Sequence, residues 1–184
     1  MAKSALRLVR GGKSQLYRIG NIICTLTEPS AIADDLDAVV LEEDTHLILT
    51  VDGRCNYIET HPVRMMTEIY RAKVHEPGSM IVNGKNWYAV TIDLDSDPLC
   101  RPVWVQQVYE NIALQIKKNS ISKLGIFLLG NVHGGLGAAE CVELFIKAVQ
   151  TWQKSQLQEV CLIVPEKSIS KVKEKFREEF EKSP

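Results

Sequence analysis

The 184-residue sequence has no excess of charge of either sign: 22 basic residues face 23 acidic ones, and the formal net charge at pH 7 is -1. A protein that binds the phosphate backbone of nucleic acid has a surplus of lysine and arginine. The balanced charge therefore excludes sequence-independent nucleic-acid binding. A nucleotide ligand is not excluded. Backbone amides and helix N-termini bind a diphosphate without any surplus of basic side chains.

Paired cysteines, metal-ligand spacings and long apolar runs are also lacking. The five cysteines include no CxxC pair and the four histidines are scattered, so neither a disulfide framework nor a metal site is predicted. No segment approaches the ~18 apolar residues of a membrane span, and the basic start MAKSALRLVRGGK lacks the apolar core of a signal peptide. We therefore expect reduced thiols, no metal, no bound cofactor, no membrane partner and a cytoplasmic location.

The second half of the chain alternates helical and buried-strand patterns. Apolar residues recur at helical spacing in three segments, and two short apolar runs between them are typical of strands covered on both faces. Ser168 is placed to cap the last helix. The predicted order is helix, strand, helix, strand, helix over residues 102–116, 124–129, 138–152, 160–164 and 168–180. Such alternation predicts βαβ crossovers and one α/β domain over residues 1–184.

The first half adds strands of less regular order. Two β-like runs, 5–10 and 15–25, flank Gly11-Gly12 and predict neighbouring strands, while Asn83-Gly84 between two β-rich runs predicts a hairpin. Further apolar runs cover 37–41 and 46–51, and a helix is predicted to begin at Pro62. These strands make the expected sheet a mixed one.

A glycine-rich loop, LLGNVHGGLGAAE, joins the strand predicted at 124–129 to the helix that starts near Ala138. Binding a diphosphate requires backbone N–H groups that converge on oxygen, in conformations that glycine tolerates and without side chains that block approach. Four glycines in this loop meet that composition, and the helix that follows adds a partial positive charge. The loop alone is compatible with a phosphate site or with a flexible turn.

The order of motifs resembles the macro domain, an ADP-ribose-binding α/β module. Asp37-Ala38-Val39-Val40 is similar to its D-A-[IV]-V motif, a V-D-G sequence follows, and residues 103–164 supply a strand, a glycine loop and a long helix. Gly20-Asn21-Ile22 looks like its G-D-I motif. The resemblance covers residues 17–165. It implies a macro domain-like, three-layer α/β/α sandwich with a mixed, largely parallel central sheet.

The resemblance also implies a ligand and a site. The ligand is ADP-ribose or a related nucleotide diphosphate, held at the carboxyl ends of the strands. Asn21 is expected near the base, where an asparagine accepts a hydrogen bond without the charge of the family's aspartate. The diphosphate is expected between two loops, with Val51, Asp52 and Gly53 on one side and Gly130, Asn131, Val132, His133, Gly134 and Gly135 on the other.

The chain departs from the family where asparagine-rich residues normally reach the distal ribose. Leu41-Glu42-Glu43-Asp44 stand there instead. Carboxylates facing the cleft would repel a pyrophosphate, and a solvated acidic turn is the favoured interpretation. The departure counts against the family's commonest chemistry and leaves another catalytic arrangement open.

The sequence is therefore compatible with three functions. The favoured one is a binding module for a small nucleotide or an ADP-ribosylated protein. The second is a hydrolase that removes ADP-ribose, with Asp44, Asp52 and His133 as candidate catalytic residues. The third is a structural or interaction module with a degraded cleft. A loop imidazole such as that of His133 can donate to a phosphate or act as a general acid or base, and it can equally be an exposed side chain with no ligand.

Overall fold

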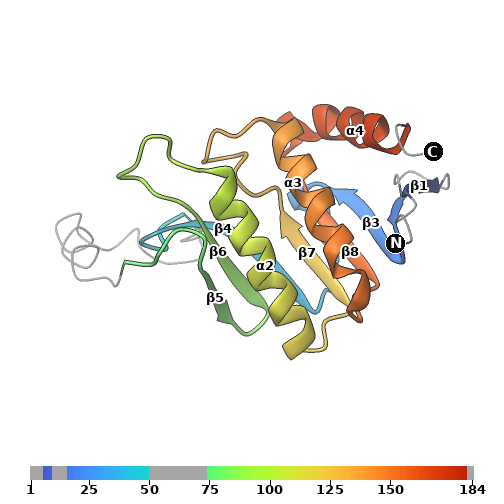
Figure 1. Ribbon diagram of the computed structural model, residues 1–184, viewed down its shortest axis with the longest axis horizontal. Helices are drawn as coiled ribbons and strands as arrows, with labels where there is room; N and C mark the ends of the chain where they lie inside the picture. The colour runs from blue at the N-terminus through green and yellow to red at the C-terminus, as the bar shows by residue number, and fades with distance from the viewer. Residues whose placement is uncertain (1–5, 10–15, 50–73, 182–184) are drawn as a thin grey trace.

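The computed structural model describes residues 6–9, 16–49 and 74–181, and its strands form one eight-stranded sheet (Figure 1). The strand order is β1-β2-β3-β8-β7-β4-β6-β5. The strands are β1 (Leu6–Val9), β2 (Leu16–Ile19), β3 (Ile22–Thr27), β4 (Ala38–Asp44), β5 (Met80–Asn83), β6 (Asn86–Ile92), β7 (Lys123–Phe127) and β8 (Glu159–Ile163). The central strands β3, β8, β7, β4 and β6 are parallel, and the edge strands pair antiparallel. The predicted mixed, largely parallel sheet is confirmed.

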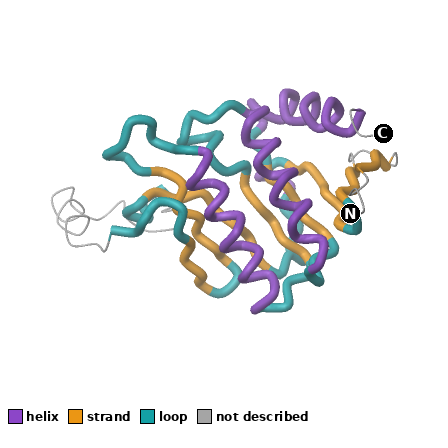
Figure 2. Tube along the Cα trace, viewed as in Figure 1, coloured by secondary structure: helices purple, strands orange, loops and turns teal. Residues whose placement is uncertain are grey.

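Helices α2 (Pro102–Lys118) and α3 (Ala138–Thr151) lie side by side across one face of the sheet, and α4 (Glu166–Glu181) packs against α3 (Figure 2). Two 3-10 turns, η1 (Pro29–Ala31) and η3 (Trp152–Lys154), complete the described elements. Proline suits the first position of α2 because its φ is already helical and its missing N–H has no partner there. No helix in the described part of the chain combines the length and the apolar character needed to cross a bilayer.

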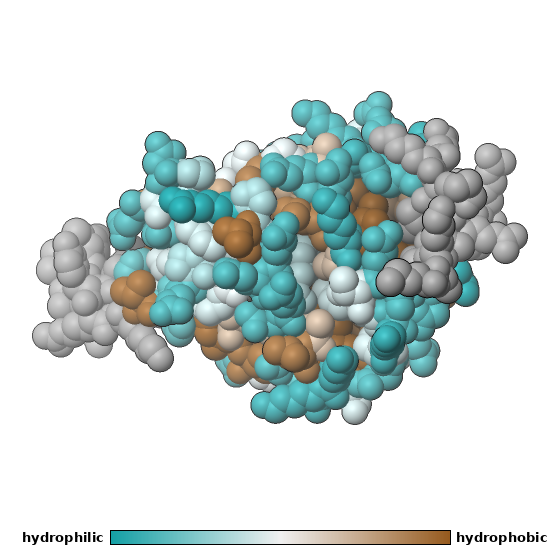
Figure 3. All heavy atoms as spheres, viewed as in Figure 1, coloured by the Kyte–Doolittle hydropathy of each residue, from teal (hydrophilic) through white to brown (hydrophobic). Residues whose placement is uncertain are grey.

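The helical patterns place the expected residues in the core. The buried positions of α2 are those of one helix face, as predicted: Val105, Val108, Tyr109, Ile112 and Ile116. The outer surface of α2 and α3 is mainly hydrophilic, with isolated exposed apolar side chains such as Leu114 (Figure 3). The helices thus bury one stripe each against the sheet and present polar side chains outward.

Strand β8 shows how the sheet is covered on both faces. Val160 and Leu162 belong to the large core beneath the helices, whereas Cys161 and Ile163 join a second cluster with Leu36 on the opposite face. Burial on both sides explains the nearly continuous apolar sequence of this strand. The helix predicted from Pro62 lies outside the described residues.

The acidic stretch after the apolar part of β4 is the largest departure from prediction. Glu42, Glu43 and Asp44 belong to β4 and are 8%, 0% and 0% exposed, so the predicted solvated turn is wrong. These carboxylates remain buried because backbone N–H groups donate to them, as described below. The apolar run 46–51 forms no strand over its described part, residues 46–49, which is a turn with Leu47 at φ 57°.

Two smaller corrections concern element ends. The run 15–25 is not one strand but the hairpin β2–β3, turned at Gly20 with φ 61°. Helix α4 begins at Glu166, so Ser168 does not cap it. The Ser168 hydroxyl instead donates to the Asn131 side-chain oxygen, 2.8 Å away, and this hydrogen bond ties α4 to the glycine loop.

Asp37 joins the start of β4 to the start of β7. Its Oδ2 accepts the backbone N–H groups of Ser122 and Lys123, at 2.8 and 2.9 Å, and these two hydrogen bonds hold the pKa of the carboxyl below its usual range. A lowered pKa in the folded state contributes stability above the unfolded pKa, and that stability is lost as pH falls through the folded value.

We therefore expect Asp37→Ala to lower the free energy of unfolding by only about 1 kcal/mol near neutral pH, because the carboxylate is exposed to solvent. The difference between variant and wild type should shrink in acid. Urea unfolding of both proteins at a series of pH values measures it. If the difference in the free energy of unfolding stays constant down to the lowest pH, the ionised Asp37 carboxylate does not contribute to stability.

Candidate functional site

The glycine-rich loop, residues 128–137, connects β7 to α3 at the carboxyl edge of the sheet. It is a closed turn, since the Leu136 N–H donates to the Gly130 carbonyl at 2.9 Å. Gly130 and Gly135 have φ values of 81° and 74°, a region that side-chain-bearing residues rarely adopt. The sequence prediction that glycine is needed here for backbone conformation is correct at these two positions.

Gly134 is needed for a different reason. A Cβ atom at this position would lie 2.4 Å from the Cys100 Cβ and 2.7 Å from the Gly130 carbonyl oxygen. Cys100 is buried at the end of the loop that follows β6, so two neighbouring loops meet here without room for a side chain. The missing side chain of Gly134 therefore faces the protein interior rather than a ligand.

Three N–H groups of the loop, those of Val132, Gly134 and Gly135, have no acceptor in the part of the chain that the structure describes. Val132 and Gly135 are exposed, whereas Gly134 is buried. Helix α3 begins at Ala138, and its N-cap residue, Gly137, has no side chain to cap the first turn. Unused amides beside the positive end of a helix form an anion-binding element.

The inner side of the loop already holds an anion, the carboxylate of Glu42. Its Oε1 accepts the Gly130 N–H and, at 3.4 Å, the Thr91 hydroxyl; its Oε2 accepts the His133 N–H at 3.3 Å and lies 3.1 Å from the His133 ring Nδ1. The side chain is only 7% exposed. A buried carboxylate is stable when several donors surround it, so Glu42 supports the loop from below.

Asp44 and Glu43 shape the neighbouring loop in the same way. The Asp44 carboxylate accepts the N–H groups of His46, Ile48 and Leu49 at 2.6, 3.0 and 3.1 Å. Glu43 Oε2 accepts the N–H groups of Asp44 and Leu49, both at 3.1 Å. Asp44, predicted as a candidate catalytic residue, is therefore a buried carboxylate that stabilises the turn after β4.

The structure does not bring Asn21 together with the glycine loop. Asn21 precedes β3, whose residue Ile23 lies opposite Glu159, so it stands at the amino edge of the sheet, where its N–H donates to the Gln153 side chain at 2.8 Å. Strands of five residues separate the two edges, roughly 16 Å at ~3.3 Å per residue. The residues at the carboxyl end of β3 are Thr27 and Glu28.

The remaining predicted site residues are distributed as follows. His133 and Val132 lie on the outer surface of the loop, with the His133 side chain 46% exposed and Val132 37% exposed. The Asn131 amide donates to the Leu136 carbonyl at 3.1 Å and so belongs to the loop's own framework. Val51, Asp52 and Gly53 lie outside the described residues.

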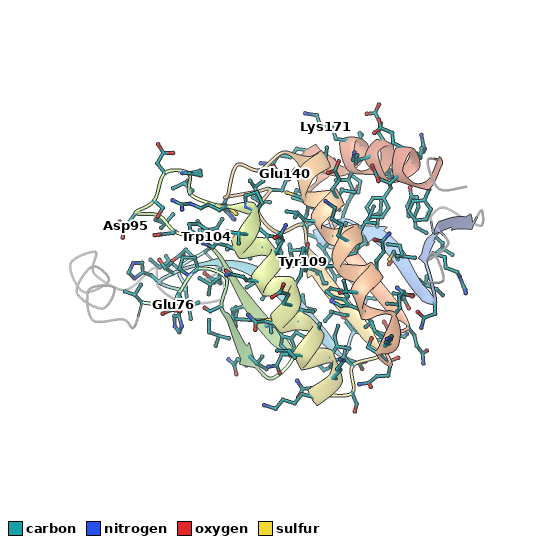
Figure 4. The ribbon with its side chains drawn as sticks, viewed as in Figure 1. Glu76, Asp95, Trp104, Tyr109, Glu140 and Lys171 are labelled. Carbon is teal, nitrogen blue, oxygen red and sulfur yellow. The ribbon has the colours of Figure 1, made fainter. Side chains whose placement is uncertain are left out.

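Two thiols lie close to the Glu42 carboxylate. Burial, with smaller contributions from Glu42 and Glu140, raises the pKa of Cys100 to about 12. Burial also raises the pKa of Cys141 to about 12, with the same charges adding to it. Both groups stay as thiols at neutral pH and are therefore poor nucleophiles. Figure 4 shows Glu140 at the first turn of α3, next to the loop.

No group of three or more histidine, cysteine, aspartate or glutamate side chains that could hold a metal ion occurs in residues 6–9, 16–49 and 74–181. The sequence did not single out Thr91 or Cys100, and it placed Glu42 in a solvated turn. Their signal was position: Glu42 and Thr91 lie near the carboxyl ends of β4 and β6, and Cys100 lies in the loop between β6 and α2, at the edge where the glycine loop was already expected. The carboxyl ends of neighbouring parallel strands meet at one edge, whatever the distance in sequence.

Comparison with known proteins identifies the fold. Neither a family model nor a curated protein matches the sequence. The Oceanobacillus iheyensis macrodomain with ADP superposes with a TM-score of 0.70 at 14% identity, over 96% of this chain and 99% of that one. The Trypanosoma brucei macrodomain in complex with ADP-ribose gives a TM-score of 0.59 at 15% identity, over 85% of this chain and 69% of that one.

The macro domain of ganglioside induced differentiation associated protein 2 gives a TM-score of 0.59 at 12% identity, over 85% of each chain. At identities this low, the superpositions establish a shared fold and nothing further. The chain has the macro domain fold, in a divergent form.

Proposed function

We propose that this protein binds ADP-ribose, or a related nucleotide diphosphate, at the carboxyl edge of its sheet. The observation that carries the proposal is that the exposed residues Val132 and Gly135 have N–H groups with no acceptor among the described residues, beside the uncapped start of α3. Such an arrangement binds the oxygens of a diphosphate. Macrodomains of the same fold are known with ADP-ribose or ADP, which supports this ligand class.

The base of the nucleotide would lie toward the carboxyl end of β3. Strand β8 separates β3 from β7, so the glycine loop and Glu28 are two strand spacings apart, about 10 Å at ~4.8 Å per spacing. A nucleoside is on the order of this length. Glu28 is exposed, and a carboxylate there can accept a hydrogen bond from an adenine amino group.

The first test is calorimetric titration with ADP-ribose, beside AMP and ribose 5-phosphate. We expect ADP-ribose to bind more tightly than either fragment, because only the whole ligand spans both ends of the edge. At ~100 times its dissociation constant it should stabilise the fold by about 2.7 kcal/mol, which a thermal melt detects. If the titration shows no heat and the melt shows no thermal shift, the protein does not have this function, and an interaction module is favoured.

Glu28→Ala and Asn21→Ala separate the two candidate sites for the base. We expect Glu28→Ala to weaken ADP-ribose by about tenfold, the usual loss for a hydrogen bond to a charged group, and to leave ribose 5-phosphate unaffected. Asn21→Ala should change neither affinity, because Asn21 lies at the opposite edge of the sheet. A loss of affinity with Asn21→Ala but not with Glu28→Ala would place the base beside Asn21 and contradict the proposed orientation of the ligand.

The hydrolytic alternative gains no support from Asp44, because both of its carboxylate oxygens accept backbone N–H groups of the turn after β4. Asp52 lies outside the described residues. A hydrolase requires a catalytic residue that a binding protein does not. A binding function is therefore the simpler explanation of the described part of the site.

A further inference from the structure

The internal carboxylate creates an electrostatic problem for any anionic ligand of the loop. Glu42 lies directly behind the loop, in contact with Gly130 and His133, and is almost completely buried. A diphosphate held by the outer amides would be a second anion a few ångströms away. Like charges in a poorly solvated site repel strongly, so binding requires a positive charge that offsets the carboxylate.

His133 is positioned to supply that charge. Its ring Nδ1 lies 3.1 Å from Glu42 Oε2, while the side chain as a whole is half exposed. The carboxylate only accepts hydrogen bonds, so Nδ1 carries the proton and Nε2 is the nitrogen that remains for a ligand. In the neutral ring Nε2 is an acceptor and cannot bind a phosphate oxygen. In the imidazolium it donates a charge-assisted hydrogen bond.

Within residues 16–49 and 74–181, the other ionisable groups on which Glu42 acts electrostatically are not cations. Tyr109 of α2, Cys100 of the loop after β6 and Cys141 of α3 are buried, and burial raises the pKa of each. Glu140 in the first turn of α3 adds negative charge. On α4, Glu166 and Lys167 are both exposed and adjacent, so they contribute little net charge.

We infer that His133 binds the diphosphate as an imidazolium and that Glu42 positions it, so that binding the nucleotide takes up a proton at this ring. The inference rests on the proposed function of the loop. It assigns the two residues different roles. His133 contacts the ligand, whereas Glu42 acts through His133 by fixing which nitrogen faces outward.

The test is titration of the full chain with ADP-ribose from about pH 6 to about pH 8.5, the range in which an imidazole changes charge. At each pH the titration is repeated in two buffers of different ionisation enthalpy, which measures the protons taken up. The pyrophosphate diester of ADP-ribose keeps a constant charge over this range. We expect the dissociation constant to rise by up to about tenfold per pH unit at the alkaline end, with uptake approaching one proton per ligand.

Variants separate this role from a structural one. His133→Asn keeps a donor for Glu42 and has no titrating group, so its affinity should be independent of pH and lower than that of the wild type at about pH 6. His75→Asn, in the segment before β5, is the matched control and should retain the wild-type pH profile. Glu42→Gln removes the repelling charge and should bind more tightly than wild type above about pH 8.

The outcomes are distinguishable. Wild-type binding that does not depend on pH, or a His133→Asn profile that matches wild type, would overturn this inference and leave the proposed function standing. Absence of binding at every pH would instead overturn the proposed function. Circular dichroism of each variant establishes that it is folded before its affinity is interpreted.

Discussion

Glu42→Ala is expected to lower the free energy of unfolding by about 3 kcal/mol, because truncating one member of a buried charged network leaves its donors without a partner. The N–H groups of Gly130 and His133 and the hydroxyl of Thr91 all donate to this carboxylate. Urea unfolding near neutral pH measures the loss. The alanine side chain also leaves a gap beneath the loop, which adds to the effect.

The matched control is Glu143→Ala. Glu143 on α3 pairs with Lys175 of α4 at 2.6 Å, but its side chain is 43% exposed. The Lys175 side chain is 13% exposed and keeps a second partner, Glu179, at 3.0 Å, so losing the half-exposed Glu143 should cost about 1 kcal/mol or less. If the two variants lose equal stability, Glu42 is not the support of the glycine loop.

Gly134→Ala is expected to destabilise the protein by about 2 kcal/mol and to weaken ADP-ribose at least tenfold. The added Cβ would overlap the Cys100 Cβ at 2.4 Å and the Gly130 carbonyl oxygen at 2.7 Å. A Cβ and a backbone oxygen cannot rotate away, so the loop itself must shift, and the amides proposed to bind the ligand must move with it. Thermal melts and calorimetric titration measure the two effects.

Gly137→Ala controls for the loss of a glycine in the same loop. This residue has an ordinary φ of -63° and no neighbouring atom within 4 Å of its Cβ position. Its substitution should change stability by less than about 1 kcal/mol. Equal destabilisation by the two substitutions would mean that close packing against Cys100 is not what position 134 requires. From the sequence alone, Gly134 would be explained by the need to leave room for a ligand outside the loop. In the structure, its Cβ position faces the protein interior.

Local patterns were enough to predict most of the fold. The i, i+3, i+4, i+7 spacing of α2, the apolar runs of β7 and β8 and the Asn-Gly turn between β5 and β6 each report on a neighbourhood of a few residues. A helix that buries one stripe and a strand that is buried on both faces each have a characteristic apolar pattern. The elements and their α/β order therefore follow from the sequence. The wrong predictions concern the ends of elements and the turns, where contacts with segments distant in sequence determine the backbone conformation.

The supports of the glycine loop depended on tertiary structure. Glu42 is 88 positions from Gly130 and 91 from His133, and no local pattern relates them. An acidic run after a strand is normally solvated, and only the convergence of donors from β6 and the loop after β7 makes its burial favourable. The same holds for Asn21, which the family resemblance placed near the base and which the structure places at the amino edge of the sheet. Sequence determined the elements and the loop, whereas strand order and direction decided which side chains meet there, because these contacts join residues far apart in the chain.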